Sequence, residues 1–357
     1  MNSIERTRLT LEHKLADRIP IDFWATGAVI KGLEQRLGIS YDDFLDRYDV
    51  DFRYIEGPAY IGPPLAPGVD IWGVGRASIT AGADGKTESY SEVTKAPLAD
   101  AQSAADVEAY DHWPDPDMFD YSVIAAQCEK AARDDRVVIF MGDRLNRIAQ
   151  LKPAMYLRGA EEIFSDLVLL PDVARAIFRK IKEFYLVYLD RILDAANGKI
   201  DIVLTGDDFG AQQGLLLSAD MWREFLKPGF AEFVDVIKKH QTIAMHHSCG
   251  SVWQIIPDMI ESRLDVLQSI QPEADGMGLA NLKKMFGTGI SYQGGVSIQK
   301  TMPFGTIEEI RKEVKTLATA AKQDGGYIFC TSHNIQADTS IDSVLALMDA
   351  YHEFGRI

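Results

Sequence analysis

Two short segments of this chain place histidine and cysteine at the ends of apolar runs. They cover residues 245–250 (MHHSCG) and residues 329–334 (FCTSHN). His247 and Cys249 are two residues apart, so their side chains point in the same direction on an extended backbone, whereas His246 points away and is expected to have a structural or supporting role. An imidazole and a thiolate that converge with a third nitrogen or sulfur ligand form the open, catalytic type of zinc site. The sequence therefore predicts a zinc site that includes His247 and Cys249.

The third ligand of this site has two candidates in the second segment. Cys330 is the softer donor, but it falls within or at the end of the expected strand. His333 lies in the loop beyond, from which a side chain reaches more easily across the mouth of a barrel. Either residue would complete three protein ligands and leave one coordination position open.

Two carboxylates follow another apolar run, at residues 202–205. We expect Asp207 and Asp208 to supply a fourth ligand, to hold a ligating imidazole in one tautomer or to transfer protons. Together with His333 from the second segment, Asp207 and Asp208 are the candidate catalytic residues.

Polar side chains and glycines at the same strand ends are candidates for contact with a substrate. Gln212 and Gln271 would offer polar contacts, and Gly294 and Gly295 would let the backbone approach a ligand closely or take a positive φ. Taken singly, a buried cysteine is usually core filler, an aspartate after a strand is often a helix cap, and such glycines are ordinary turns. The gathering of all these residues at one edge of a sheet favours a functional site.

The composition excludes several classes of partner. The chain has 357 residues, 46% of them hydrophobic, and a formal net charge of -16, which argues against nucleic acid or an anionic membrane as a partner. Three cysteines in a chain of this length suggest no disulfide framework. The first residues carry no apolar signal segment, and no stretch approaches the length of a membrane span, so we expect a cytoplasmic protein.

Apolar runs alternate with amphipathic helical patterns along most of the chain. Strands are expected at residues 18–24, 137–141, 202–205, 242–247, 264–268, 289–293 and 326–330. Helices are expected at residues 4–17, 104–111, 159–168, 172–197, 218–239, 251–261 and 279–286 and from residue 306. This alternation indicates a parallel sheet that is buried on both faces, and no glycine-rich nucleotide loop follows any strand. We therefore predict an α/β fold, a (β/α)8 TIM barrel that forms one domain over residues 1–357.

One stretch departs from this rhythm. The β-rich runs at residues 77–80 and 87–93 flank residues 83–86 (ADGK). An Asp-Gly pair between two such runs is a strong hairpin signal. We predict a β-hairpin near residues 75–95 that projects from the barrel.

Five segments give the chain its resemblance to a known family. They are residues 206–214 (GDDFGAQQG), 226–228 (LKP), 247–251 (HSCGS), 294–296 (GGV) and 332–336 (SHNIQ). With them, the chain resembles the uroporphyrinogen decarboxylase superfamily over nearly its whole length, and this resemblance also implies a (β/α)8 barrel.

The resemblance implies one of two chemistries. True uroporphyrinogen decarboxylases use no metal and grip their substrate with the arginines of an Arg-Gln-Ala-Gly-Arg segment after the first strand. The equivalent residues 24–31 (WATGAVIK) lack both arginines. The other branch holds zinc methyltransferases such as the methylcobalamin:coenzyme M enzymes, with a His-x-Cys pair that His247 and Cys249 match. The late cysteine of those enzymes aligns with His333 rather than Cys330, so the third ligand departs from their pattern.

The expected function is therefore a zinc-dependent methyltransferase of a corrinoid-dependent methyl-transfer or demethylation system. The resemblance implies methylcobalamin supplied on a partner corrinoid-binding protein, a small-molecule methyl donor or acceptor, and a homodimer. The alternatives are a carboxy-lyase of the uroporphyrinogen decarboxylase type and, from a different class, a non-catalytic protein that binds metal or corrinoid.

Overall fold

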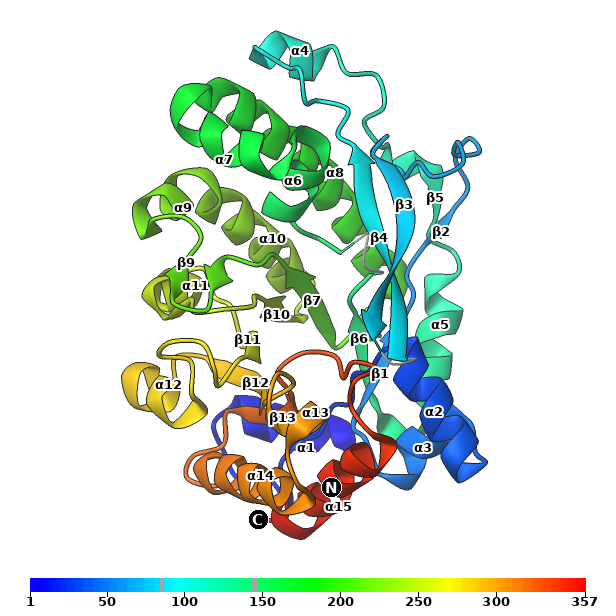
Figure 1. Ribbon diagram of the computed structural model, residues 1–357, viewed down its shortest axis with the longest axis vertical. Helices are drawn as coiled ribbons and strands as arrows, with labels where there is room; N and C mark the ends of the chain where they lie inside the picture. The colour runs from blue at the N-terminus through cyan, green and yellow to red at the C-terminus, as the bar shows by residue number, and fades with distance from the viewer. Residues whose placement is uncertain (84–85, 143–146) are drawn as a thin grey trace.

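A curved parallel sheet forms the centre of the protein (Figure 1). The computed structural model describes residues 1–83, 86–142 and 147–357, and within these residues the sheet has seven strands in the order β1-β6-β7-β10-β11-β12-β13. The strands are β1 (Phe52–Ile55), β6 (Val137–Phe140), β7 (Ile202–Gly206), β10 (Ile243–His247), β11 (Val266–Ile270), β12 (Ser291–Val296) and β13 (Tyr327–Thr331). Six of the seven predicted strands match strands of this sheet. The seventh strand of the sheet, β1, was not predicted.

The predicted first strand lies between the two edges of this sheet. The backbone N–H of Asp22 donates to the carbonyl of Phe329 in β13 at 2.9 Å. On the other side, the N–H of Asp51, directly before β1, donates to the carbonyl of Ile21 at 3.0 Å. This extended segment stands where an eighth strand of a barrel would stand, which confirms the predicted TIM-barrel-like α/β fold.

The strands read as continuous apolar runs because both of their faces are covered. In β6, Val137 and Ile139 point into the barrel and pack with Ile202, Leu204, Met245 and other strand residues. Val138 and Phe140 point outward into the main core, where the helices cover them. A strand that is buried on both faces needs apolar residues on both, so it lacks the alternation of apolar and polar residues that is typical of a half-exposed strand.

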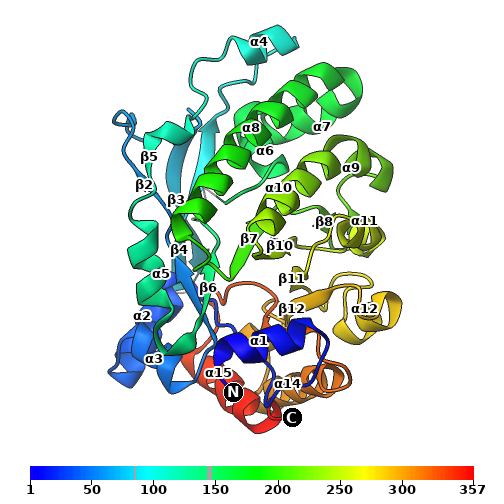
Figure 2. The same cartoon turned by 180° about the vertical axis from the view of Figure 1, so that it is seen from behind.

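The outer layer consists of helices that follow the strands (Figure 2). The helices are α1 (Ser3–Leu11), α2 (Gly27–Leu37), α3 (Tyr41–Arg47), α4 (Ala104–Glu108), α5 (Ile124–Ala131), α6 (Leu151–Arg158), α7 (Ala160–Leu169), α8 (Pro171–Ala196), α9 (Ala219–Phe225), α10 (Lys227–Lys239), α11 (Ile256–Glu261), α12 (Leu279–Phe286), α13 (Thr301–Phe304), α14 (Ile307–Ala321) and α15 (Ile341–Phe354). No helix in the described part of the chain is both long enough and apolar enough to cross a membrane.

Two helices differ from their predicted bounds for local reasons. The helix predicted over residues 4–17 ends at Leu11, because His13 takes a left-handed φ of 54° that the helix cannot continue through. The helix predicted over residues 218–239 divides into α9 and α10, since Pro228 has no N–H to continue α9 but fits the first turn of α10.

The predicted hairpin is present as an antiparallel pair outside the central sheet. Its strands are β3 (Gly75–Ala83) and β4 (Lys86–Lys95), paired with Ser78 opposite Ser91. It crosses in front of β1 and β6 in Figure 1 and behind them in Figure 2. The Asp-Gly pair at residues 84–85 lies outside the described residues. The other strands are the two-residue pairs β2 (Ala59–Tyr60) with β5 (Phe119–Asp120) and β8 (Gly210–Ala211) with β9 (Gly214–Leu215).

Candidate metal centre

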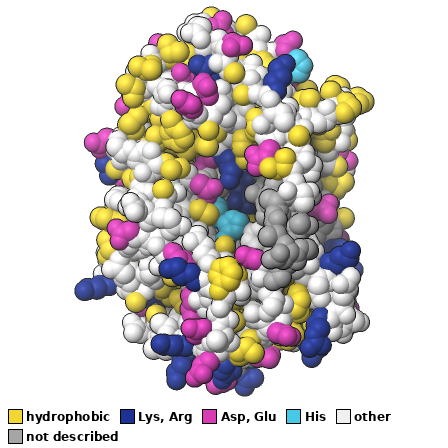
Figure 3. All heavy atoms as spheres, in the orientation of Figure 1, with side chains coloured by type: hydrophobic (Ala, Val, Ile, Leu, Met, Phe, Trp, Pro, Cys, Tyr) yellow, Lys and Arg dark blue, Asp and Glu magenta, His cyan; other side chains and the backbone are white. Residues whose placement is uncertain are grey.

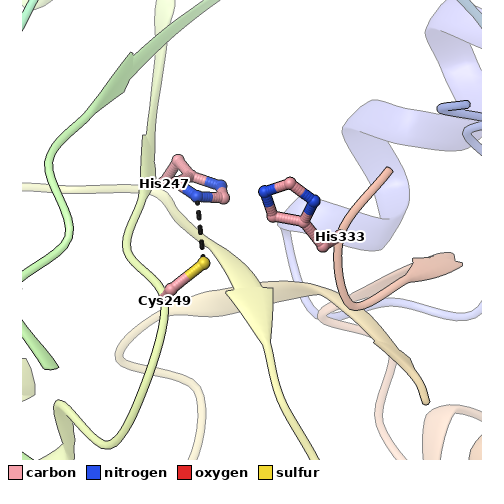
Figure 4. A group of neighbouring side chains, drawn as sticks. All are labelled: His247, Cys249 and His333. Carbon is pink, nitrogen blue, oxygen red and sulfur yellow. Dashed lines mark hydrogen bonds between the residues drawn. The ribbon is translucent and has the colours of Figure 1, made fainter. Parts of the chain in front are cut away.

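Three side chains meet at the carboxyl ends of β10 and β13. His247 is the last residue of β10, Cys249 follows two residues later, and His333 lies two residues beyond the end of β13. One ligand atom from each lies within 4.8 Å of the others, and the Cys249 Sγ is 3.4 Å from the His247 Nε2 (Figure 4). Two nitrogens and one sulfur that converge in this way form a donor set suited to zinc.

The other candidate for the third ligand lies elsewhere. Cys330 sits inside β13, where it pairs with Gly295 and is almost fully buried. Its Sγ lies 4.0 Å from the Thr331 hydroxyl, and among the described residues it does not belong to the group of three. The structure therefore places His333, and not Cys330, beside His247 and Cys249, because the loop after β13 turns His333 back over the barrel mouth.

The neighbouring strand fixes the orientation of His247. The Nδ1 of His247 lies 2.5 Å from the side-chain oxygen of Gln268, the residue opposite it in β11. An amide oxygen only accepts, so Nδ1 carries a proton, and Nε2, which faces Cys249, is the nitrogen left to bind a metal. Such a contact sets both the tautomer and the ring orientation of a metal-binding histidine. Nothing in the sequence singled out Gln268, because strand register cannot be seen there.

Asp208 supports the same centre from the end of β7. One carboxylate oxygen accepts from the Cys249 N–H at 3.0 Å and lies 3.4 Å from the His247 Nε2. The other accepts from the Lys152 ammonium at 3.0 Å. Burial acts to raise the pKa of Asp208, but the hydrogen bond and charge of His247, together with Lys152, outweigh it and hold the pKa well below its usual range. An ionised carboxylate therefore stands beside the three candidate ligands.

Asp207 has a different task from its neighbour. It lines the cavity beside the centre, but its carboxylate accepts the backbone N–H groups of Gln150, Leu151 and Lys152 at 2.5, 2.9 and 2.7 Å. These N–H groups lie at the start of α6, so Asp207 anchors that helix end. Burial raises the pKa of Asp207 to about 6, against the three donors, which lower it. Asp207 thus anchors the start of α6, and its catalytic role stays a prediction.

The ligand atoms differ in their protonation. Burial and the Asp208 charge raise the pKa of the Cys249 thiol to about 12, so the thiol is neutral without a metal. Burial and the charge of His247 lower the pKa of His333 to about 4, so its ring is neutral at physiological pH. A metal ion would find an available imidazole at His333 and would have to displace a proton from Cys249.

The four predicted substrate contacts lie outside the cavity that adjoins the centre, and their role in substrate binding stays a prediction. Gln271 is buried and accepts from the Gly250 N–H at 2.7 Å, which fixes the turn after Cys249, while Gln212 is exposed. Gly294 and Gly295 have φ of 115° and 102°, and a Cβ on either would lie 3.0 Å from its nearest neighbour. None of the four is among the described residues that line the cavity.

A cavity of about 220 Å³ opens in front of the centre. In Figure 3 the face carries a hollow near its middle, with a histidine side chain and basic side chains inside it. Its lining comprises Trp24, Met141, Arg147, Ala149, Lys152, Pro153, Tyr156, Gly206, Asp207, Asp208, His247, His333 and Asn334. Among the described residues it holds both candidate histidine ligands, so the centre faces a pocket and not the closed core.

Comparison with known proteins identifies the family. The sequence model of uroporphyrinogen decarboxylase (URO-D) matches residues 95–354, most of the chain. The chain belongs to the uroporphyrinogen decarboxylase family.

Individual relatives of the URO-D family are distant from this chain. A uroporphyrinogen decarboxylase from Anaeromyxobacter sp. (strain Fw109-5) is 24% identical over 237 residues, which cover 66% of this chain and 64% of that protein. Another, from Ruthia magnifica subsp. Calyptogena magnifica, is 24% identical over 182 residues, or 47% of each chain. Both matches span less than two thirds of the relative. A methyltransferase from Methanosarcina mazei shares the fold with a TM-score of 0.72 and 17% identity over 99% of both chains.

Two of the segments that carry the URO-D resemblance pack tightly at the centre. Gly250 has a φ of 80°, and a Cβ there would lie 2.3 Å from the backbone carbon of Gly210. The loops after β7 and β10 therefore touch through their backbones, which carries Asp208 to the N–H of Cys249. Only glycine allows both the positive φ and this close approach.

Several cavity residues escaped the sequence interpretation. Trp24 begins the segment where decarboxylases are expected to carry their arginines, yet the sequence drew attention only to the arginines it lacks. Arg147, Lys152 and Tyr156 come from the region after β6, which held no histidine or cysteine. Asn334 directly follows His333, and this position next to a candidate ligand was the only feature of the sequence that could have identified it.

Proposed function

We propose that this protein is a zinc-dependent methyltransferase of a corrinoid-dependent methyl-transfer or demethylation system. The observation that carries the proposal is the convergence of His247, Cys249 and His333 within 4.8 Å at the mouth of the barrel. The fold shared with a methyltransferase from Methanosarcina mazei agrees with it. Methylcobalamin would be supplied on a partner corrinoid-binding protein, and the cavity would hold the small-molecule methyl donor or acceptor.

The donor set fits zinc. Ligand atoms around a tetrahedral zinc ion lie roughly 3.3–3.8 Å apart for bonds of about 2.0–2.3 Å. The His247 Nε2 and Cys249 Sγ already have that separation, at 3.4 Å, and His333 lies within 4.8 Å of both. Three protein ligands leave a position open toward the cavity, as in catalytic zinc sites. Bound zinc would supply Lewis acidity, which lowers the pKa of a thiol acceptor or stabilises charge on the leaving heteroatom of a methyl donor.

The chain's own residues prepare this centre. Gln268 holds the His247 ring so that Nε2 faces inward. Asp208 fixes the Cys249 backbone, and Lys152 balances the charge of that carboxylate. The neutral ring of His333 needs to lose no proton before it binds a metal. Asp208, which lines the cavity, is the carboxylate that would take part in proton transfer during the reaction.

The size of the cavity supports methyl transfer over porphyrinogen decarboxylation. Pockets for drug-sized ligands have roughly 300–1,000 Å³, and this cavity has about 220 Å³. A tetrapyrrole is larger than most drug-sized ligands. The arginines with which decarboxylases are expected to grip their substrate are also missing from residues 24–31. A cytoplasmic location and a homodimer complete the proposal, and both derive from the sequence and the family resemblance.

Metal content and methyl transfer test the proposal together. We would measure zinc per chain in the wild-type protein and in Cys249→Ala, His333→Ala and Cys330→Ala. We expect about one zinc per wild-type chain, loss of zinc and of methyl transfer to or from a corrinoid in the first two variants, and retention of both in Cys330→Ala, because Cys330 lies away from the centre.

Two results would overturn the proposal. One is a folded wild-type protein that takes up no zinc on reconstitution. The other is conversion of uroporphyrinogen to coproporphyrinogen by the metal-free protein, which would establish the carboxy-lyase alternative. Zinc or corrinoid binding without methyl transfer to any acceptor would point to the non-catalytic alternative instead.

A further inference from the structure

The inside of the barrel changes from apolar to polar at the level of His247. The apolar cluster that fills the barrel includes Met245 of β10, Val266 of β11 and Ile328 of β13. Side chains on a strand point the same way at every second residue, so the residues two positions further along form the next layer toward the mouth. They are His247, Gln268 and Cys330. A candidate metal ligand thus shares a layer of the barrel with polar side chains of neighbouring strands.

Gln293 of β12 and Asp22 of the extended first segment also point into the barrel. The chain neighbours of these two residues, Tyr292 on one side and Ile21 and Phe23 on the other, belong to the outer core that the helices cover. Because neighbouring side chains on an extended backbone point in opposite directions, Gln293 and Asp22 face the interior. Both are almost fully buried. The proposed metal centre assigns a role to neither of them.

The carboxylate of Asp22 accepts hydrogen bonds from three donors. One oxygen accepts from the Tyr54 hydroxyl at 2.5 Å and from the Gln293 Nε2 at 2.6 Å, and the other accepts from the Phe23 N–H at 2.8 Å. Burial raises the pKa of Asp22, whereas the three hydrogen bonds, which favour the ionised form, act to lower it. A carboxylate that is held by three donors acts only as an acceptor in this layer.

An acceptor at one end of the layer sets the direction of two amides. Because Gln293 turns its nitrogen to Asp22, its oxygen lies on the other side of the amide, where it is buried without a hydrogen-bond partner among the described residues. That oxygen is suited to the amide nitrogen of Gln268, the residue opposite Gln293 in register. Gln268 in turn presents its oxygen to the His247 Nδ1 at 2.5 Å. Both amides thus have their oxygen on the His247 side and their nitrogen on the Asp22 side.

Asp208 acts on His247 in the opposite sense. Its carboxylate lies 3.4 Å from the His247 Nε2, so it favours a proton on the nitrogen that would bind a metal. A neutral imidazole with its proton on Nε2 cannot bind a metal through that atom. The position of the proton therefore depends on the acceptor at Nδ1, and that acceptor is present only while the Gln268 amide keeps its orientation.

We propose that Asp22 is a positioning residue that sets the tautomer of His247. It acts through two amides, because the carboxylate aligns the Gln293 amide and Gln293 aligns the Gln268 amide. Gln268 then holds a proton on the His247 Nδ1, which leaves Nε2 available to a metal. Asp22 lies before residues 95–354, which match the URO-D model, so the family match does not include it. The effect of Asp22 on zinc rests on the proposed metal centre, whereas its effect on the tautomer does not.

The location of the His247 proton can be measured in the metal-free protein. Proton–nitrogen correlation NMR spectra of the histidine rings at alkaline pH report which nitrogen carries it, and the signals of His247 are those that disappear in His247→Asn. We expect a proton on Nδ1 in the wild-type protein and a shift of population toward Nε2 in Asp22→Asn. Asparagine has the same size but can donate as well as accept, so both amides can reverse. An unchanged proton on Nδ1 in folded Asp22→Asn would overturn the proposal.

Zinc affinity, measured by competition with a chelator, gives a second readout. The apparent affinity falls with the fraction of the protein that is able to bind, so Asp22→Asn should weaken zinc binding by about two- to tenfold. Gln293→Leu should cause a similar loss. In a Gln268→Leu background, where the connection to His247 is already cut, Asp22→Asn should have no further effect. The same loss from Asp22→Asn with and without Gln268 would show that Asp22 acts through its charge alone, and would overturn the proposal.

Asp201→Asn is the matched control. Burial also raises the pKa of Asp201, but this carboxylate stands directly before β7, at the opposite end of the barrel, where it accepts from the Val138 N–H at 2.7 Å. Asp201→Asn should change neither the His247 tautomer nor the zinc affinity. Changes equal to those of Asp22→Asn would refute a specific role of Asp22.

The two readouts separate this proposal from the proposed function. A protein that takes up no zinc, but in which Asp22→Asn moves the His247 proton, would refute the metal centre and retain the role of Asp22. A zinc-loaded protein with methyl-transfer activity, in which Asp22→Asn changes neither the tautomer nor the zinc affinity, would refute the role of Asp22 and retain the proposed function.

Discussion

The side chains of His247 and Gln268 face each other across two neighbouring parallel strands, with the imidazole Nδ1 2.5 Å from the amide oxygen. This contact decides which nitrogen of His247 faces Cys249. Because Nδ1 donates to Gln268, Nε2 is the nitrogen that is directed into the candidate metal centre.

Loss of the Gln268 amide should weaken the metal centre without removing a ligand. Partners of this kind typically account for 10- to 100-fold in metal affinity. We expect Gln268→Leu to lower zinc affinity by about that factor, and Gln268→Glu, which keeps an acceptor at the same place, to retain or raise it. Competition with a chromogenic chelator measures both.

The control for this prediction is Gln323→Leu, an exposed glutamine at the end of α14. Zinc affinities of Gln268→Leu and Gln323→Leu that do not differ would show that Gln268 does not orient His247.

Zinc binding should release a proton, and the source is Cys249. Burial and Asp208 raise the pKa of this thiol to about 12, so the thiol is protonated in the metal-free protein, whereas the ligand is the thiolate. The His333 pKa is lowered to about 4, so that ring contributes no proton near neutral pH. Zinc affinity should therefore rise about tenfold per pH unit between roughly pH 7.5 and 9.

Calorimetry in buffers of different ionisation enthalpy counts the released protons directly. We expect about one proton per zinc in the wild-type protein and fewer in Cys249→Ser. A pH-independent zinc affinity over this range would argue that Cys249 is not a ligand.

The barrel and its hairpin could be predicted because their signals are local. The apolar runs that became β6, β7, β10 and β13 each carry their own pattern, and the Asp-Gly pair stands between two β-rich runs. The strand β1 escaped prediction because Phe52–Ile55 is only four residues long and contains Arg53.

The candidate site could be predicted only where sequence spacing determines geometry. His247 and Cys249 lie on one strand end, and the structure brings them together. The choice between Cys330 and His333 depends on how the loop after β13 folds, which spacing does not reveal. Gln268 and Arg147 reach the site through strand register and packing, so no local pattern marked them.

Gly206 allows Arg147 and His247 to occupy the same side of β7, so a methyl group there should disturb both. A Cβ would lie 2.8 Å from the Arg147 Cδ and 3.0 Å from the His247 Cβ. Overpacking of this kind costs about 1–3 kcal/mol. We expect Gly206→Ala to lower the free energy of unfolding by that amount and to weaken zinc binding, because His247 is a candidate ligand.

The matched control is Gly278→Ala, since a Cβ on Gly278 meets nothing within 4 Å. The free energy of unfolding in urea and the zinc affinity of Gly278→Ala should equal the wild-type values. Wild-type stability and wild-type zinc affinity in the Gly206→Ala protein would contradict the packing argument.

Asp207 and Asp208 are adjacent in sequence, but their substitutions should have different effects. Loss of Asp207 should lower the stability of the fold, and loss of the Asp208 charge should weaken metal binding. Asp207 accepts three N–H groups at the start of α6, and their loss leaves buried donors without a partner, at a cost of about 1–3 kcal/mol. We expect Asp207→Ala to lower the free energy of unfolding by that amount in urea titrations. Its zinc content should stay near the wild-type value, because Asp207 is outside the group of three ligands.

Asp208→Asn should show the reverse pattern. The amide oxygen can still accept from the Cys249 N–H, so the fold is retained, but the negative charge beside His247 and Cys249 is lost and zinc affinity should fall. Asp220→Ala, at an exposed carboxylate on α9, controls for general loss of charge. If Asp207→Ala lost zinc while its stability stayed at the wild-type value, Asp207 would belong to the metal centre, and its anchoring of α6 would not be its main role.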